Sequence, residues 1–163
     1  MNKEINYLVH DSPERSFVRV SEKATFLNCS PLREFFLNRL DAGQSNFVVD
    51  FDNCKSLDST FLGILVSLAI KVKARGNLSL INLRDRNLET VRNLGIHKIA
   101  VVSSEKMENL DDLENINPVG EDRKASAQLI YEAHKTLRDL NQKNQKLFCD
   151  VVKFLDQKRE DSA

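Results

Sequence analysis

Residues 47–70 read FVVDFDNCKSLDSTFLGILVSLAI, and two hydrophobic patterns meet within this stretch. Residues 47–51 are nearly all apolar, which is typical of a central strand buried on both faces of a sheet. Downstream, five apolar residues fall on one helical face: Phe61, Leu65, Leu68, Ala69 and Val72. The stretch therefore predicts a strand that leads through a short polar segment into a helix.

The polar segment between the two patterns is Asp58-Ser59-Thr60. Each of these residue types can cap a helix by accepting a hydrogen bond from a free backbone N–H group. One cap is enough for one helix. Three in a row indicate either redundant capping or a hydroxyl group with a second role.

The rest of residues 1–103 extends this alternation. The patterns predict strands near 5–9, 16–20, 78–83 and 99–102. They predict helices that start at a Ser30 cap with Pro31 in the first turn, and again from about 86 to 94. Gly76 and Gly95 are placed to end helices in the left-handed conformation. The order strand-strand-helix-strand-helix-strand-helix-strand predicts an α/β domain, a sheet covered by helices.

The chain changes character after residue 103. Residues 104–122 hold seven acidic residues against one lysine, which predicts an acidic linker over 104–120. Residues 121–163 contain no Gly or Pro and predict one long amphipathic helix. Its apolar seam has heptad spacing: Ile130, Ala133, Leu137, Leu140, Asn144, Leu147, Val151 and Phe154.

Two interpretations of this helix stay open. It can fold back on its own domain, or it can pair with a second copy as a coiled coil, with Asn144 fixing the register at an a position. A straight helix of roughly 36 residues would exceed 50 Å, whereas a domain of about 100 residues has a radius of gyration near 13 Å. Length therefore favours pairing and a homodimer.

Composition excludes several classes of function. Lys plus Arg and Asp plus Glu are balanced at 24 each, and there are no Trp and two Tyr, so neither nucleic acid nor an anionic membrane is an expected partner. The three cysteines lack paired spacing, which is typical of a reducing compartment. The chain shows no signal-peptide pattern and no apolar run of membrane length, so we expect a cytoplasmic protein.

Catalytic and metal-binding patterns are missing from the sequence. It has no GxGxxG, GxxxxGK[ST], HExxH or GxSxG motif, and His10, His97 and His134 are scattered. Asp50 and Asp52 could bind a cation, although solvation at the end of a strand is the more ordinary interpretation. We therefore expect no enzyme activity, no metal and no cofactor.

One family pattern runs through about residues 5–103: the strand before DST, DST itself with Leu62-Gly63 and the apolar helix after it, and the later segments LSLINL and LETVRNLGI. Together these segments resemble the STAS domain. The similarity is to the bacterial anti-sigma factor antagonists, whose pattern is Asp-Ser-[Ser/Thr]-Gly-Leu-Gly, with an extra C-terminal helix here. It implies a mixed sheet of four to five strands. This sequence departs from the pattern at Phe61, which stands where the first Gly is usual, and at Asn28, where Asp is common.

The resemblance also implies a function. Ser59, with Thr60 as the alternative, matches the serine that an anti-sigma factor with serine kinase activity phosphorylates, and a serine phosphatase reverses the modification. The unmodified protein binds the kinase, and phosphorylation ends that binding. The residues expected to contact the partner are Asn28, Asp58, Ser59, Thr60 and Phe61, and for Phe61 a purely core position is the alternative. The alternatives are a STAS scaffold that oligomerises through its C-terminal helix, or a small-ligand module, for which no phosphate-binding loop is present.

Overall fold

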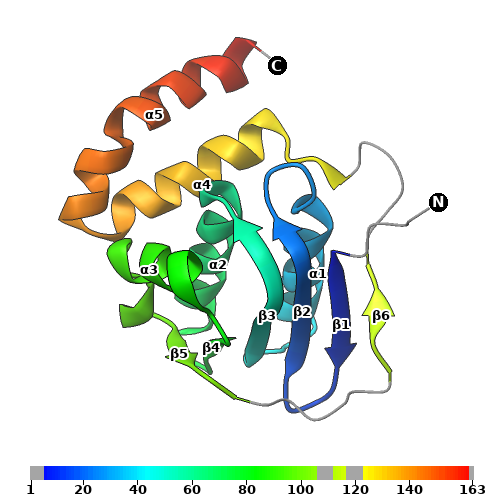
Figure 1. Ribbon diagram of the computed structural model, residues 1–163. Coiled ribbons are helices and arrows are strands. Elements are labelled where there is room, and N and C mark those ends of the chain that lie inside the picture. Colours follow the sequence, from blue (N-terminus) through cyan, green and yellow to red (C-terminus); the bar gives the residue numbers. More distant parts are fainter. Residues whose placement is uncertain (1–5, 106–111, 117–122, 162–163) are drawn as a thin grey trace.

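A computed structural model describes residues 6–105, 112–116 and 123–161. Its centre is a mixed sheet with the strand order β5-β4-β3-β2-β1-β6 (Figure 1). The strands are β1 (Tyr7–Asp11), β2 (Ser16–Ala24), β3 (Phe47–Leu57), β4 (Leu78–Ile81), β5 (Val101–Ser103) and β6 (Glu114–Asn115). The pairs from β2 to β5 are parallel, whereas β1 pairs antiparallel with both β2 and β6.

Strand β3 holds the central position that its apolar sequence predicted. Residues 47–51 are all buried, and β3 lies between β2 and β4. The sheet has six strands rather than four to five, because Glu114 and Asn115 pair with β1. These two residues belong to the predicted acidic linker, most of which lies outside the described residues.

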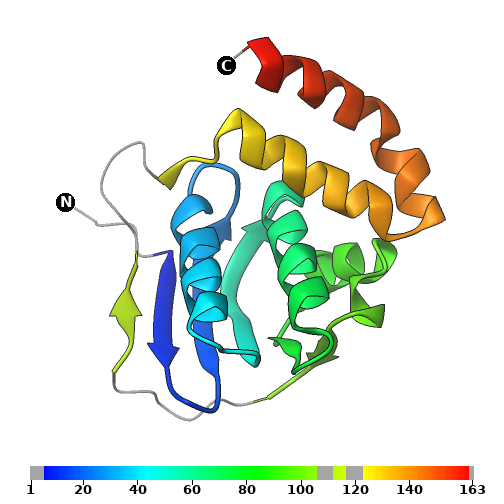
Figure 2. The ribbon, with the colours of Figure 1, turned by 180° about the vertical axis from the view of Figure 1, so that it is seen from behind.

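Helices α1 (Ser30–Asp41) and α2 (Ser59–Val72) cover one face of the sheet (Figure 2). The main core lies between them and the strands, and it includes Phe47, Val49, Leu65 and Leu80. A smaller cluster of Phe17, Val48 and Ile81 forms on the opposite face, with Leu113 packed against it. Helix α3 (Asp85–Asn93) and the 3-10 helix η1 (Ile96–Lys98) connect β4 to β5.

The helix ends differ from prediction at two positions. Ser30 is the first residue of α1 and not its cap, because Cys29 occupies the cap position and makes no side-chain capping bond. Gly95 is left-handed, with φ of 79°, as predicted, but Gly76 is not among the residues with positive φ. Gly76 is instead required by crowding, since a Cβ there would collide with the carbonyl oxygen of Ser45.

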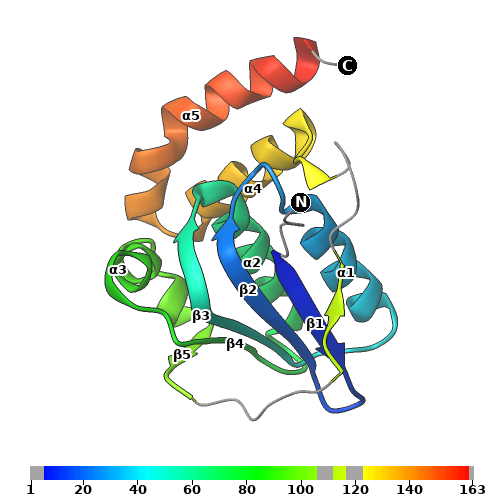
Figure 3. The ribbon, with the colours of Figure 1, turned by 45° about the vertical axis from the view of Figure 1, so that its right-hand side comes forward.

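The C-terminal region forms two helices where the sequence predicted one. Helix α4 (Ala127–Leu140) crosses α2, and α5 (Gln142–Asp161) turns back along the outer side of α4 (Figures 1 and 3). We call residues 127–161 the C-terminal hairpin. Among the described residues, no helix combines the length and apolarity needed to cross a bilayer.

Candidate functional site

The candidate site lies where β3 passes into α2, and Asp58 organises it. Asp58 has extended backbone geometry and is the N-cap of α2: its carboxylate accepts the Phe61 N–H at 3.0 Å. Its second oxygen accepts the Phe26 N–H at 2.8 Å, which fixes the loop between β2 and α1 against the start of α2. Of the three capping candidates, Asp58 is therefore the cap.

Ser59 and Thr60 are the first two residues of α2, and their environments differ. Ser59 is partly exposed. Thr60 is 3% exposed, so its hydroxyl group is enclosed in the core. Only Ser59 therefore presents a hydroxyl group near the surface, at the positive end of the helix dipole.

The Ser59 hydroxyl group contacts His134 of α4. Its Oγ lies 2.7 Å from His134 Nε2, and His134 Nδ1 lies 2.7 Å from the Ile130 carbonyl oxygen. Because a carbonyl oxygen can only accept, Nδ1 carries a proton in this pair. In the neutral ring Nε2 is then an acceptor, and Ser59 donates to it. His134 is 8% exposed, and its ring packs edge-on with that of Phe148, with ring centroids 5.9 Å apart.

A serine hydrogen-bonded to an imidazole nitrogen is also the arrangement that activates a nucleophile in hydrolases. Here Ser59 lines neither the cavity between α1, α2 and α4 nor the one beside His10 and Phe17. What the hydrogen bond does in this structure is join the start of α2 to α4.

Besides Thr60, two further residues expected to contact a partner are buried in the core. Phe61 is 0% exposed, stacks on Tyr7 with centroids 6.5 Å apart, and meets Phe51 edge-on. Asn28 is 3% exposed; its Oδ1 accepts the Tyr7 hydroxyl group at 2.8 Å and its Nδ2 donates to the Lys23 carbonyl oxygen at 2.8 Å. In this conformation neither side chain faces the surface, which favours the core interpretation of Phe61 and does not favour a partner contact by Asn28.

The buried network beneath the site shifts two acidic groups. The pKa of the Tyr7 phenol is well above its usual value, first because of burial and then because Cys29 and Asp58 are close. Burial, followed by the Asp58 charge, raises the pKa of the Cys29 thiol to about 12. Both groups therefore stay neutral at ordinary pH and support the site by packing.

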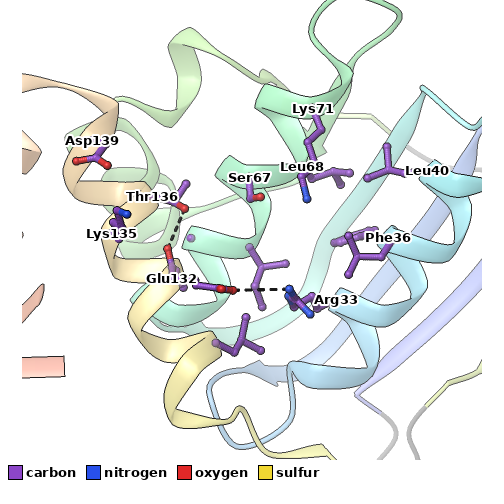
Figure 4. A pocket seen from close by; sticks show the side chains of 15 residues that line it. Arg33, Phe36, Leu40, Ser67, Leu68, Lys71, Glu132, Lys135, Thr136 and Asp139 are labelled. Atoms are coloured by element: carbon purple, nitrogen blue, oxygen red, sulfur yellow. Dashed lines mark hydrogen bonds and ion pairs between the residues drawn. The ribbon is translucent and has the colours of Figure 1, made fainter. Parts of the chain in front are cut away.

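Helix α4 lies unusually close to α2 beside this site. A Cβ on Gly63 would collide with the backbone carbonyl group of Ala133, so the two helices can touch only because residue 63 has no side chain. Next to this contact, a cavity of about 360 Å³ lies between α1, α2 and α4 (Figure 4). Arg33 and Glu132 span it as an ion pair of 3.7 Å.

The predicted oligomerisation seam divides into two parts. Leu137 is 0% exposed, and Ile130 and Leu140 pack against the main core, so these three residues serve their own domain. On α5, the side chains left exposed are Leu147 at 54%, Val151 at 41% and Phe154 at 57%.

Asn144 does not act as a coiled-coil register residue in this structure. It is 0% exposed, and its Nδ2 donates to the Leu94 carbonyl oxygen at 2.9 Å. Asn141 donates to the same oxygen at 3.1 Å and accepts the Asn144 N–H at 2.8 Å. The two amides thus bind the end of α3 and start α5.

Asp50 and Asp52 are occupied by protein groups. Asp50 is 4% exposed, pairs with Arg19 at 3.5 Å and accepts the Asn82 Nδ2 group at 3.0 Å. Asp52 pairs with Arg84. Asp50 is thus buried and bonded instead of solvated, and the described residues contain no group of three metal-ligating side chains.

Sequence reasoning missed three residues at the site. His134 lies 75 positions from Ser59, and no local pattern could join them. Phe26 and Leu27 are 38% and 48% exposed in the loop held by Asp58. Two adjacent apolar residues in a loop are a visible signal for a contact surface, but their neighbour Asp58 is known only from the fold.

Comparisons with known proteins agree with this architecture. SpoIIAA in its unphosphorylated form superposes with a TM-score of 0.52 at 14% identity, covering 62% of this chain and 89% of that one. The Bacillus SpoIIAA in its phosphorylated form superposes with a TM-score of 0.54 at 13% identity, covering 61% of this chain and 91% of that one. An anti-sigma factor antagonist from Mycobacterium paratuberculosis superposes with a TM-score of 0.55 at 19% identity, covering 61% of this chain and 86% of that one. These likenesses establish the fold.

The sequence comparison adds the family. A search of curated proteins gives no match. A family model described as "Mlab, STAS domain" matches residues 8–103, which is more than half of the chain and includes every strand from β2 to β5 together with Ser59. The C-terminal hairpin lies beyond the matched residues. The chain therefore belongs to the STAS domain family.

Proposed function

We propose that this protein is a regulatory binding module of the anti-sigma factor antagonist type, controlled by phosphorylation of Ser59. Its partners are an anti-sigma factor with serine kinase activity and a serine phosphatase. The catalytic groups of the cycle belong to those partners, so the chain itself is a substrate and a ligand in the cytoplasm. The observation that carries the proposal is the partly exposed Ser59 directly after the capping Asp58 in a STAS domain.

The fold supports a phosphorylation switch at this position. A phosphate group on Ser59 would lie at the N-terminus of α2, where the helix dipole favours negative charge. The modification adds a charge of about −1.5 to −2 beside the Asp58 carboxylate. The helix tolerates this charge, whereas a partner surface suited to the unmodified site is repelled. The solved SpoIIAA structures, one phosphorylated and one not, support the view that this fold serves such a cycle.

The partner surface we propose differs from the one expected from sequence. Because Asn28 and Phe61 are buried, the apolar contacts fall to Phe26 and Leu27. These two side chains belong to the loop whose backbone Asp58 holds. Together with Asp58 and Ser59 they form a surface that combines apolar area with a group whose charge changes.

Charge substitution tests this function. Ser59→Asp should lose the kinase partner in a pull-down, whereas Ser59→Ala should keep it. The matched control is Ser56→Asp, which adds the same charge at an exposed residue near the end of β3. Mass spectrometry of the chain purified from its own cells should find phosphate on Ser59. Phosphate only at other residues, or equal loss of the partner in Ser59→Asp and Ser56→Asp, would contradict the proposal.

A second candidate function is a scaffold subunit that assembles through α5. It is favoured by the exposed Leu147, Val151 and Phe154, which recur at heptad spacing on one side of the hairpin. Light scattering should then show a dimer that Phe154→Ser dissociates, while the control Ile70→Ser, an equally exposed apolar residue on α2, has no effect. A monomer at all accessible concentrations would exclude this candidate.

A further inference from the structure

The Ser59 hydroxyl group is occupied by the protein's own C-terminal hairpin. His134 Nε2 lies 2.7 Å from its Oγ, and the imidazole is held from behind by the Ile130 carbonyl oxygen. A hydrogen bond of this length leaves no space for a phosphoryl group between the two atoms. In this arrangement Ser59, the proposed switch residue, is hydrogen-bonded within its own chain before any other protein arrives.

The hairpin is docked along the whole length of α4. Near its start, the Ala125 N–H donates to the Phe26 carbonyl oxygen at 2.7 Å and Leu129 is buried in the main core; in the middle, Ala133 meets Gly63 backbone to backbone. At the far end, Asn141 and Asn144 both bind the carbonyl oxygen of Leu94. The contact with Ser59 therefore belongs to a built interface between α4 and α2.

We propose that the C-terminal hairpin is an intramolecular cover for the Ser59 surface, which must undock from α2 before Ser59 is phosphorylated or contacted by its kinase. This proposal rests on the proposed function. Docking of the hairpin and phosphorylation of Ser59 then exclude one another. By thermodynamic linkage, whatever undocks the hairpin promotes modification, and modification in turn disfavours docking.

Gly63 offers a way to undock the hairpin without touching Ser59 or His134. Gly63→Ala places a methyl group against the Ala133 carbonyl oxygen. Within α2 itself the change is favourable, because alanine stabilises a helix interior relative to glycine. The matched control is Ser67→Ala, one turn farther along α2 on the same side of the same cavity, which adds no bulk.

Hydrogen–deuterium exchange of the full chain tests the cover without any kinase. Amides of α4 should exchange about tenfold faster or more in Gly63→Ala than in wild type or Ser67→Ala. Amides of β3 should be unchanged, which separates undocking from misfolding. Ser59→Glu should also speed exchange in α4, whereas Ser59→Ala should have a much smaller effect. Unchanged α4 exchange in both Gly63→Ala and Ser59→Glu would overturn the proposal.

A serine kinase that modifies the wild-type chain provides the second measurement. Gly63→Ala should be phosphorylated at Ser59 several-fold faster than Ser67→Ala. Equal rates in the two variants would overturn the cover and leave the proposed function standing. If the kinase modified the wild-type chain and both variants only at residues other than Ser59, the proposed function would be contradicted, and the exchange measurement would still decide on the cover.

Discussion

At the scale of single residues, the DST segment divides its work in a way that residue types alone do not determine. Asp58 caps α2, Ser59 faces α4, and Thr60 is buried. The sequence predicted that one of these three residues caps the helix, and the resemblance to the STAS domain singled out Ser59. The sequence placed Phe61 on the apolar face of the helix, but it could not show that Phe61 and Asn28 both pack on Tyr7, which is far away in the chain.

The buried position of Phe61 predicts a difference between two phenylalanines close to the site. Phe61→Ala should lower the free energy of unfolding by about 3–5 kcal/mol, because it leaves a cavity against Tyr7 and Phe51. Phe26→Ala should change the free energy of unfolding little, since Phe26 is 38% exposed, but it should weaken binding to the kinase partner. Urea denaturation and a binding assay measure the two effects. Equal stability losses would show that Phe61 is not a core residue.

Buried thiols predict how stability depends on alkaline pH. The pKa of Cys29 rises from 9.0 to about 12, and that of Cys54 rises from 9.0 to about 11, in both cases mainly because of burial. A raised pKa means that the folded state holds the thiol proton more tightly than the unfolded chain does. The stability that the two protonated thiols contribute is therefore complete below pH 9, and it is lost as the pH rises toward their pKa values in the folded state. The urea concentration at the unfolding midpoint should therefore decrease as the pH is raised beyond about 9, and it should decrease less steeply in Cys29→Ala. A midpoint that rises over this range would contradict the assignment.

At the scale of elements, the C-terminal region shows where pattern reading fails. The heptad seam and the lack of Gly or Pro after residue 121 both predicted one helix. The chain breaks instead at Asn141, whose backbone is extended, with φ of −160°. Its amide stabilises the break by capping α5 and by binding Leu94, and the second of these contacts is invisible in the sequence.

This break predicts the effect of removing the Asn141 amide. Asn141→Ala deletes a helix cap and a donor to Leu94, so it should cost about 1–2 kcal/mol of stability. The nearby control Lys143→Ala, an exposed position on α5, should cost much less. Exchange in the first turn of α5 and in the last turn of α3 should rise in Asn141→Ala only. A loss no greater than that of the control would show that the break is held by packing alone.

At the scale of the whole molecule, local periodicity predicted the alternation of strands and helices, and the central place of β3, because neighbours along the chain determine those patterns. The partners of the C-terminal hairpin could not be predicted, because they depend on contacts such as Gly63 with Ala133 and Ser59 with His134. Gly63, which matches a glycine of the STAS pattern, is also the residue that allows α4 to pack closely against α2. One position thus serves both the domain and the segment added to it.

The arrangement of the hairpin predicts that it opens at lower free energy than the sheet. Strand β3 is paired on both sides, whereas the hairpin touches the domain through one face of α4 and two amides at Leu94. Elements with fewer buried contacts open in smaller, cheaper steps. In hydrogen exchange at increasing denaturant below the unfolding transition, amides of α4 and α5 should exchange as one group, before those of β3 and β4. If the amides of the hairpin exchanged only together with those of the strands, undocking would require as much free energy as unfolding of the whole domain. A kinase could then not displace the hairpin from a folded domain. The ease of this opening therefore determines whether α4 is a removable cover or a permanent part of the domain.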